Sequence, residues 1–228
     1  MINRGNSPLF DEWPDAYDRW FTTPIGSLVK RYELELIMNL LKPKRSEAIL
    51  DAGCGTGVFT FDILESGSRV VGLDLSLPML NRAEKKLHGL PFQRVLGDIS
   101  GLPFLESSFD KVVSVTALEF IEDAKEAVGE LLRVTKKGGT IVIATLNSLS
   151  PWASRRMAEA KKTHTLFEKV IFRSPDELRS LASRDCVVKT VIHFEKEDIP
   201  ESAVRIEQEG QRKDLKSGAF VAVRWTKP

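Results

Sequence analysis

The chain has 228 residues, 42% of them hydrophobic, which is enough for one substantial core and predicts a single domain, residues 1–228. Lys and Arg total 33 against 32 for Asp and Glu, so a formal net charge of +1 excludes a general attraction to nucleic acid or to an anionic membrane. Cys54 and Cys186 are too few for a disulfide framework, and the histidines show no metal-ligand spacing. No signal-peptide or membrane-spanning pattern is visible. We expect a cytoplasmic monomer or homodimer without a metal, a membrane or a nucleic-acid partner.

The first segment combines aromatic residues with a helical pattern. Leu28, Tyr32, Leu36 and Leu40 recur at four-residue spacing, which predicts a helix, and an aromatic-rich stretch precedes it. We expect residues 1–46 to form an N-terminal helical cap that covers one edge or the mouth of a sheet.

The middle of the chain, residues 47–147, alternates apolar runs with helical patterns, which is typical of βαβ units and a parallel sheet. Ser76 can cap a helix in which Met79, Ala83 and Leu87 recur at helical spacing. The expected strands are residues 48–52, 69–74, 92–98, 111–115 and 140–146.

The last part, residues 148–228, contains a long insert followed by two β-like runs. Residues 174–177 combine a Ser N-cap, a Pro at the first helical position and a Glu at the third, which predicts a helix start. The runs at 187–194 and 219–225 are separated by a charged stretch that contains Pro200, and we expect no helix between them. Two consecutive strands without a crossover helix predict an antiparallel final pair.

A glycine-rich turn directly follows the first expected strand. Gly53, Gly55 and Gly57 stand where the backbone must turn, and a helical pattern comes next. Glycines adopt positive φ and let a ligand approach the main chain, while the following helix offers free N–H groups to a carboxylate or phosphate. A merely tight connection is also compatible with this pattern, but its place at the carboxyl end of a strand favours a ligand site.

Spacing helps to choose the ligand. The dinucleotide fingerprint needs a sixth-position glycine where this chain has Val58, so the pattern is GxGxG. Asp74 ends the second strand 74 − 53 = 21 residues after Gly53, where a carboxylate can accept hydrogen bonds from both ribose hydroxyls. Asp98 ends the third strand on the same sheet edge and could accept a hydrogen bond from an adenine amino group. Each aspartate alone is also compatible with an ordinary turn former.

Together these motifs resemble those of class I S-adenosylmethionine-dependent methyltransferases. The first motif of that family is similar to LDAGCGTG here, the second to VVGLDLS, and the third and fourth to LGDISGLPFLESSFDKVVSV. The nearest resemblance is to the small-molecule branch that contains the ubiquinone and menaquinone methyltransferases, whose members methylate many acceptors. The resemblance implies a Rossmann-like α/β fold with a seven-stranded, mostly parallel sheet in the order 3-2-1-4-5-7-6, strand seven antiparallel, and helices on both faces.

The same resemblance implies S-adenosylmethionine as the cofactor. The glycine turn would bind its methionine part with Asp51 supporting the loop, Asp74 would hold the ribose, and Asp98 would contact the adenine. Tyr17 resembles an N-terminal aromatic residue that covers the cofactor in relatives. The expected cofactor-binding set is Tyr17, Asp51, Gly53, Cys54, Gly55, Thr56, Gly57, Asp74, Leu75, Met79, Gly97, Asp98, Ile99, Thr116 and Leu118.

We expect the acceptor pocket at the variable ends of the chain. Its expected lining is Trp13, Trp20, Phe21, Glu119, Asn147, Trp152 and Phe167. The aromatic members are equally compatible with packing of the N-terminal helix on the core. A general base is needed only if the acceptor must lose a proton, and the candidates are Glu119, His164 and His193, although a helix-start or salt-bridged surface role stays open for Glu119.

These features predict transfer of a methyl group from S-adenosylmethionine to an unidentified small-molecule acceptor. Such a transfer needs positioning rather than a nucleophilic side chain, because the sulfonium already provides a good leaving group. One alternative is a non-catalytic S-adenosylmethionine-binding partner protein. The other is a nicotinamide-dependent oxidoreductase, which the missing sixth-position glycine and the final strand pair disfavour. Nucleic-acid methylation is disfavoured by the balanced charge and by the lack of an Asn/Asp-Pro-Pro-aromatic motif after the fourth strand.

Overall fold

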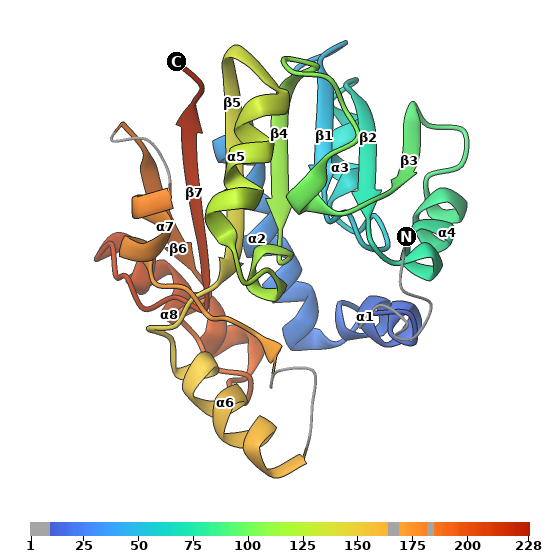
Figure 1. The fold of residues 1–228 in the computed structure, drawn as a ribbon. Helices are drawn as coiled ribbons and strands as arrows, with labels where there is room; N and C mark the ends of the chain where they lie inside the picture. Colours follow the sequence, from blue (N-terminus) through green and yellow to red (C-terminus); the bar gives the residue numbers. More distant parts are fainter. Residues whose placement is uncertain (1–9, 164–168, 182–184) are drawn as a thin grey trace.

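The computed structural model describes residues 10–163, 169–181 and 185–228. They form one seven-stranded sheet in the order β3-β2-β1-β4-β5-β7-β6, in which only β7 runs antiparallel to its neighbours (Figure 1). The strands are Ala48–Ala52 (β1), Arg69–Asp74 (β2), Phe92–Leu96 (β3), Phe109–Val115 (β4), Thr135–Leu146 (β5), Val187–Val191 (β6) and Phe220–Thr226 (β7). The expected α/β class, strand order and antiparallel last strand are confirmed.

Helices cover both faces of the sheet. They are Pro14–Trp20 (α1), Pro24–Leu41 (α2), Thr60–Glu65 (α3), Leu77–Lys86 (α4), Ala124–Val134 (α5), Pro151–Thr163 (α6), Pro175–Leu181 (α7) and Pro200–Arg212 (α8), with short 3-10 turns at Ile99–Gly101 (η1) and Leu118–Phe120 (η2). The core on one face contains α2, α3 and part of α4, and the core on the other face contains α5 and α7 (Figure 1). Among the described residues, no helix is both long and apolar enough to cross a membrane.

Side-chain caps begin the helices where the sequence predicts. Ser76 Oγ accepts a hydrogen bond from Met79 N–H at the start of α4. At α7, Ser174 and Glu177 form a reciprocal capping box, because Glu177 accepts from Ser174 N–H at 2.5 Å and Ser174 accepts from Glu177 N–H at 3.2 Å. These local signals set where the crossover helices start, and so which loops reach the carboxyl edge of the sheet.

The absence of a helix between the last two strands was a wrong expectation, because α8 lies there. Its buried residues are Ala203, Glu207 and Gly210, which recur at helical spacing but include no large apolar side chain. A stripe of small and charged residues gives no apolar periodicity, so the pattern was not visible. Pro200 stands in the first turn of the helix, where a missing N–H costs nothing.

Candidate functional site

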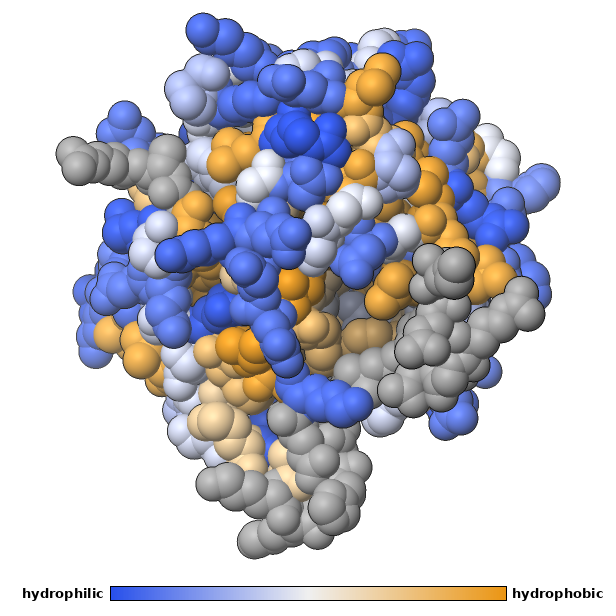
Figure 2. Space-filling view, viewed as in Figure 1, coloured by the Kyte–Doolittle hydropathy of each residue, from blue (hydrophilic) through white to orange (hydrophobic). Residues whose placement is uncertain are grey.

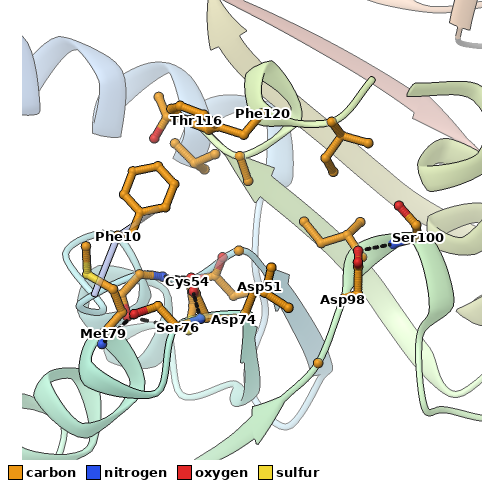
Figure 3. A pocket seen from close by; sticks show the side chains of 18 of the residues that line it. Phe10, Asp51, Cys54, Asp74, Ser76, Met79, Asp98, Ser100, Thr116 and Phe120 are labelled. Carbon is orange, nitrogen blue, oxygen red and sulfur yellow. Dashed lines mark hydrogen bonds between the residues drawn. The ribbon is translucent and has the colours of Figure 1, made fainter. Parts of the chain in front are cut away.

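One cavity of about 570 Å³ opens at the carboxyl ends of the parallel strands (Figure 3). Figure 2 shows the corresponding face hollowed near its centre, with apolar side chains in the walls. From the expected cofactor-binding set, the cavity is lined by Tyr17, Asp51, Gly53, Cys54, Gly55, Asp74, Leu75, Met79, Gly97, Asp98, Ile99 and Thr116. The fold therefore brings loops that are far apart in the sequence to one place, as expected for a doubly wound sheet.

The glycine turn after β1 needs glycine for two different reasons. Gly53 has φ +81°, and a Cβ at this position would lie 2.4 Å from the Cβ of Ala117. Gly55 has φ +54° and open space around its absent side chain. The N–H groups of Gly53 and Cys54 both donate to the carbonyl of Leu73, at 2.7 and 3.0 Å, and this ties the turn to β2. The turn thus combines a left-handed backbone with an open wall toward the cavity.

Asp74 at the end of β2 joins two turns. Its carboxylate accepts hydrogen bonds from Gly55 N–H at 2.8 Å and from Ser76 N–H at 2.9 Å. Burial raises the pKa of Asp74, although the two N–H donors act in the opposite direction. Because the same side chain lines the cavity, it can exchange these main-chain donors for the hydroxyl groups of a ligand.

Two further carboxylates line the cavity on either side of Asp74. Asp51 is buried and accepts a hydrogen bond from the Thr60 hydroxyl at 2.6 Å. Burial, opposed by that bond and reinforced by the neighbouring charge of Asp74, raises the pKa of Asp51 to about 7. Asp98 accepts a hydrogen bond from Ser100 N–H at 2.9 Å and caps η1 (Figure 3). This bond uses one carboxylate oxygen and fixes the side chain at the cavity wall.

The opposite wall of the cavity is built by the N-terminal segment and the loop after β4. Thr116 has φ +47°, a strained conformation for a β-branched residue, and it lines the cavity together with Tyr17. Burial raises the pKa of Tyr17, which therefore stays protonated. Phe10 meets Phe120 edge to face with ring centroids 4.7 Å apart (Figure 3).

The cavity is strongly acidic. Among the described residues, its charged lining side chains are Asp51, Asp74, Asp98, Glu122, Asp123 and Glu126, and one basic side chain, Lys169. A ligand that carries positive charge is favoured by such a site, and strongly anionic ligands are disfavoured.

Comparison with known proteins relates the central part of the chain to methyltransferases. Residues 50–143 match the family described as a methyltransferase domain. The match spans less than half of the chain. A malonyl-[acyl-carrier protein] O-methyltransferase of Hamiltonella defensa is 42% identical over 98 residues, which are 43% of this chain and 37% of that protein. A demethylmenaquinone methyltransferase of Beutenbergia cavernae is 34% identical over 146 residues, 64% of this chain and 59% of that protein. The chain thus spans well under two thirds of the length of these curated relatives.

Solved structures share the fold over most of the chain. An S-adenosylmethionine-dependent methyltransferase from Thermotoga maritima superposes with a TM-score of 0.73 at 23% identity, covering 96% of this chain and 99% of that one. A geranyl diphosphate C-methyltransferase from Streptomyces coelicolor A3(2) superposes with a TM-score of 0.63 at 22% identity, covering 87% and 76% of the two chains. At these identities the similarity establishes the fold alone.

Three residues of the expected cofactor set lie behind the cavity wall. Thr56 and Leu118 are completely buried, and Gly57 has φ +75° with Leu87 packed 3.0 Å from the place of its Cβ. Thr56 donates a hydrogen bond to Asp18 of α1 at 2.6 Å. These residues support the cavity wall without lining the cavity.

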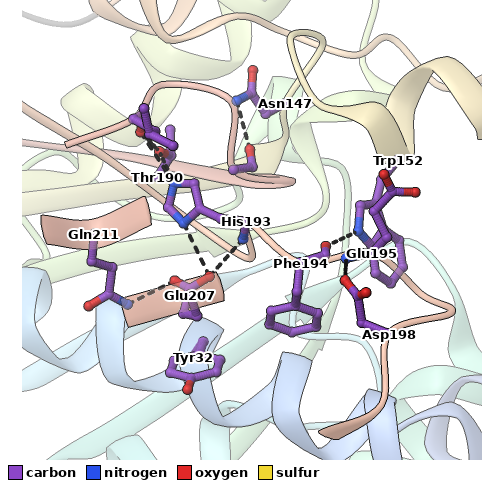
Figure 4. Close-up of polar contacts among 12 residues, drawn as sticks. Tyr32, Asn147, Trp152, Thr190, His193, Phe194, Glu195, Asp198, Glu207 and Gln211 are labelled. Carbon is purple, nitrogen blue, oxygen red and sulfur yellow. Dashed lines mark hydrogen bonds and ion pairs between the residues drawn. The ribbon is translucent and has the colours of Figure 1, made fainter. Parts of the chain in front are cut away.

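The expected acceptor-pocket residues are used mainly for packing. Trp152 donates its indole N–H to the carbonyl of Phe194 at 2.6 Å (Figure 4). Trp20 packs edge to face on Trp152. Asn147 donates to the carbonyls of Lys216 and Gly218, both at 2.7 Å. Phe21 packs between Tyr17 and Phe59, while Trp13 at the start of α1 is 39% exposed. None of these described residues lines the cavity, and Phe167 lies outside the described residues.

The candidate bases are not presented to the cavity either. Glu119 is fully buried on η2, accepts from the Thr145 hydroxyl at 2.8 Å, and keeps Oε1 without a hydrogen-bond partner. Burial raises its pKa to about 7, against the effects of hydrogen bonds and of the nearby Arg156 and Arg173. His193 is paired with Glu207 of α8 at 3.1 Å (Figure 4). His164 lies outside the described residues.

Sequence reasoning missed several lining residues. They are Phe10, Val58, Phe59, Ser76, Ser100, Val115, Ala117, Phe120, Ile121, Glu122, Asp123, Glu126 and Lys169. For residues 120–123 a signal existed, because they follow the loop at the end of a parallel strand on the same edge as Asp74. Phe10 had none, since only the fold brings it against Phe120.

Proposed function

We propose that this chain is an S-adenosylmethionine-dependent methyltransferase whose acceptor is a small molecule or a carrier-bound acyl group. The observation that carries the proposal is the cavity in which the glycine turn, Asp74 and Asp98 converge at one sheet edge. The methyltransferase-domain match supports it. So do relatives named for malonyl-[acyl-carrier protein] and demethylmenaquinone methylation. Neither the oxidoreductase nor the non-catalytic alternative has comparable support.

The chemistry of the cavity suits this cofactor. A sulfonium and an amino group carry positive charge, and the lining of the cavity is acidic. In our proposal the turn from Gly53 to Gly57 holds the methionine part with Asp51 behind it, Asp74 accepts from the ribose hydroxyls, and Asp98 accepts from the adenine amino group. Ile99 and Met79 pack beside the ring. Gly55, with open space at its Cβ position, lets the ligand approach the main chain.

S-adenosylmethionine supplies a methyl group on a good leaving group, so the chain needs no nucleophile of its own. Its residues must align the acceptor and exclude water. We assign alignment to Tyr17 and Thr116, which line the cavity where the N-terminal helix meets the end of β4. We assign water exclusion to Phe10 and Phe120, which meet on the same side of the cavity as Thr116 (Figure 3). This aromatic wall is our proposed place for the acceptor.

Calorimetry on the full chain with S-adenosylmethionine, S-adenosylhomocysteine and NAD tests the cofactor. We expect both sulfur ligands to bind and NAD not to bind. Binding of NAD alone would overturn the proposal and favour the oxidoreductase.

Transfer itself is tested with radiolabelled methyl donor and a panel of acceptors that differ in charge and attachment. The panel contains an aromatic hydroquinone, an aliphatic amine, and free and carrier-bound dicarboxylates. Labelled product with one class would identify the acceptor chemistry. Tight cofactor binding without transfer to any class would favour the non-catalytic partner protein instead.

A further inference from the structure

Helix α1 lies beside α4 at the cavity, although none of its residues is fully buried (Figure 1). Partly buried Tyr17 and Trp20 pack on the core, and acidic side chains make the remaining contacts. Asp11 accepts from the Ser76 hydroxyl at 2.7 Å, and Asp15 pairs with Arg82 at 3.1 Å. Polar contacts therefore contribute much of the attachment of this helix to the methyltransferase domain.

Asp18 makes the densest of these contacts. Its carboxylate accepts from the Thr56 hydroxyl at 2.6 Å, from Lys86 Nζ at 2.9 Å and from Arg82 Nε at 3.0 Å. Burial opposes its ionisation, but these three donors outweigh burial and lower the pKa of Asp18. Its side chain is only 17% exposed. Charge-assisted bonds in such a sheltered position are stronger than exposed ion pairs.

One partner of Asp18 belongs to the cofactor turn itself. Thr56 stands between Gly55 and Gly57, is completely buried, and is also within 3.2 Å of Lys86 Nζ. Gly55 N–H donates in turn to Asp74. Two hydrogen bonds on neighbouring residues of the turn thus connect Asp18 of α1 with Asp74, the carboxylate expected to hold the ribose.

We infer that Asp18 is a positioning residue that joins the N-terminal helix to the glycine turn, so that the helix closes and the turn orders in one step. We call Asp18 with Thr56, Lys86 and Arg82 the latch. When the latch opens, α1 leaves the cavity wall, the turn loosens, and the ligand escapes. Its identity as a cofactor latch rests on the proposed function, whereas the coupling between helix and turn does not.

Hydrogen exchange of the ligand-free full chain tests the coupling. Asp18→Ala is expected to raise exchange in residues 10–21 and in residues 52–60 together, and to leave β7 unchanged. Thr56→Val should do the same, and Thr56→Ser should restore protection because the hydroxyl returns. Asp15→Asn is the matched control: it lies on the same helix and pairs with Arg82, but does not touch the turn. It should leave residues 52–60 protected.

Ligand kinetics give the second readout. We expect Asp18→Ala to accelerate S-adenosylhomocysteine dissociation by about ten- to a hundredfold, the range for loss of one or two charge-assisted hydrogen bonds. Asp15→Asn should dissociate at nearly the wild-type rate. Faster exchange in residues 10–21 alone, with unchanged dissociation, would overturn the latch. Failure of the wild type to bind would overturn the proposed function, while the exchange experiment would still decide the coupling.

Discussion

Polar residues of the β1–β4 region and of the β5–β7 region have different uses. Asp74 and Asp98, which follow the parallel strands β2 and β3, line a cavity. Asn147 and His193, which follow β5 and β6, direct their polar atoms to main-chain carbonyls and to α8. Both regions bury polar groups, and buried polar groups need partners. In the β1–β4 region a ligand in the cavity can supply some of these hydrogen-bond partners. In the β5–β7 region, Asn147 and His193 find their partners within the protein.

The topology explains this difference. Parallel strands with crossover helices leave their carboxyl-end loops at one edge, where they can diverge around a cavity. The antiparallel strand β7 returns between β5 and β6, and the loops beside it pack on one another. Trp152, for example, meets Phe194 there instead of reaching the cavity. We therefore expect polar residues of the β1–β4 region to act in ligand binding and those of the β5–β7 region to act in folding stability. The following substitutions test this difference.

The largest effect is expected for Gly53→Ala. The new Cβ would lie 2.4 Å from that of Ala117, on a backbone with φ +81°. Overpacking and left-handed strain together should lower the free energy of unfolding by about 2 to 4 kcal/mol. Urea unfolding followed by circular dichroism measures it. Gly55→Ala is the control: its Cβ meets open space, so only strain of about 1 kcal/mol remains. Equal losses for the two variants would contradict the packing argument.

Asp74→Ala should mainly affect ligand binding. We expect S-adenosylmethionine affinity to fall by about 1.5 to 3 kcal/mol through loss of charge-assisted bonds to the ribose. Calorimetry measures it on a variant shown to be folded. Asp176→Ala, an exposed change on α7 away from the cavity, should leave affinity unchanged. If folded Asp74→Ala bound S-adenosylmethionine with wild-type affinity, the proposal that Asp74 binds the ribose hydroxyls would be wrong.

Much of the first region could be predicted because its signals are local. The Gly53–Gly57 turn and the cap at Ser76 are each encoded within a few residues, so strand ends and helix starts followed directly. Strand limits were less accurate: β4 begins at Phe109 and β5 at Thr135, where charged or glycine residues concealed the pairing. The contact between Phe10 and Phe120 joins distant segments, and no local pattern encodes it.

The second region was harder to predict for the same physical reason. Helix α8 is stabilised by a buried carboxylate, Glu207, and by Gly210, over which the His193 ring packs so closely that a Cβ would lie 2.3 Å from it. Such a contact depends on a partner elsewhere in the chain rather than on an apolar stripe. His193 was a candidate base from residue type alone, and only the fold reveals its partner.

Glu207→Gln tests that structural assignment through pH. Burial acts against charge on both groups, but their mutual hydrogen bonding wins, raising the pKa of His193 above 6.5 and lowering that of Glu207 below 4.5. The His193 contribution is complete below pH 6.5 and is lost as pH rises through its raised pKa. The Glu207 contribution is present above pH 4.5 and is lost as pH falls through its lowered pKa.

The pair should therefore stabilise most between about pH 4.5 and 6.5, where both partners are charged. At pH 6 we expect Glu207→Gln to lower the free energy of unfolding by about 1 to 2 kcal/mol, and by less at pH 9. Glu209→Gln, an exposed change nearby on α8, should have little effect at either pH. A pH-independent loss in Glu207→Gln would contradict the charged pair.

The smallest effect is expected for Trp152→Phe, which keeps one six-membered aromatic ring and removes the rest of the indole, including the N–H donor to Phe194. The carbonyl left without its partner should lower the free energy of unfolding by about 1 kcal/mol. Cofactor affinity and acceptor turnover should stay at wild-type values, because Trp152 does not line the cavity. Phe120→Leu is the contrasting change, since it removes the aromatic contact with Phe10 at the cavity. If turnover fell in Trp152→Phe and not in Phe120→Leu, the acceptor would lie in the second region, and the division between the two regions would fail.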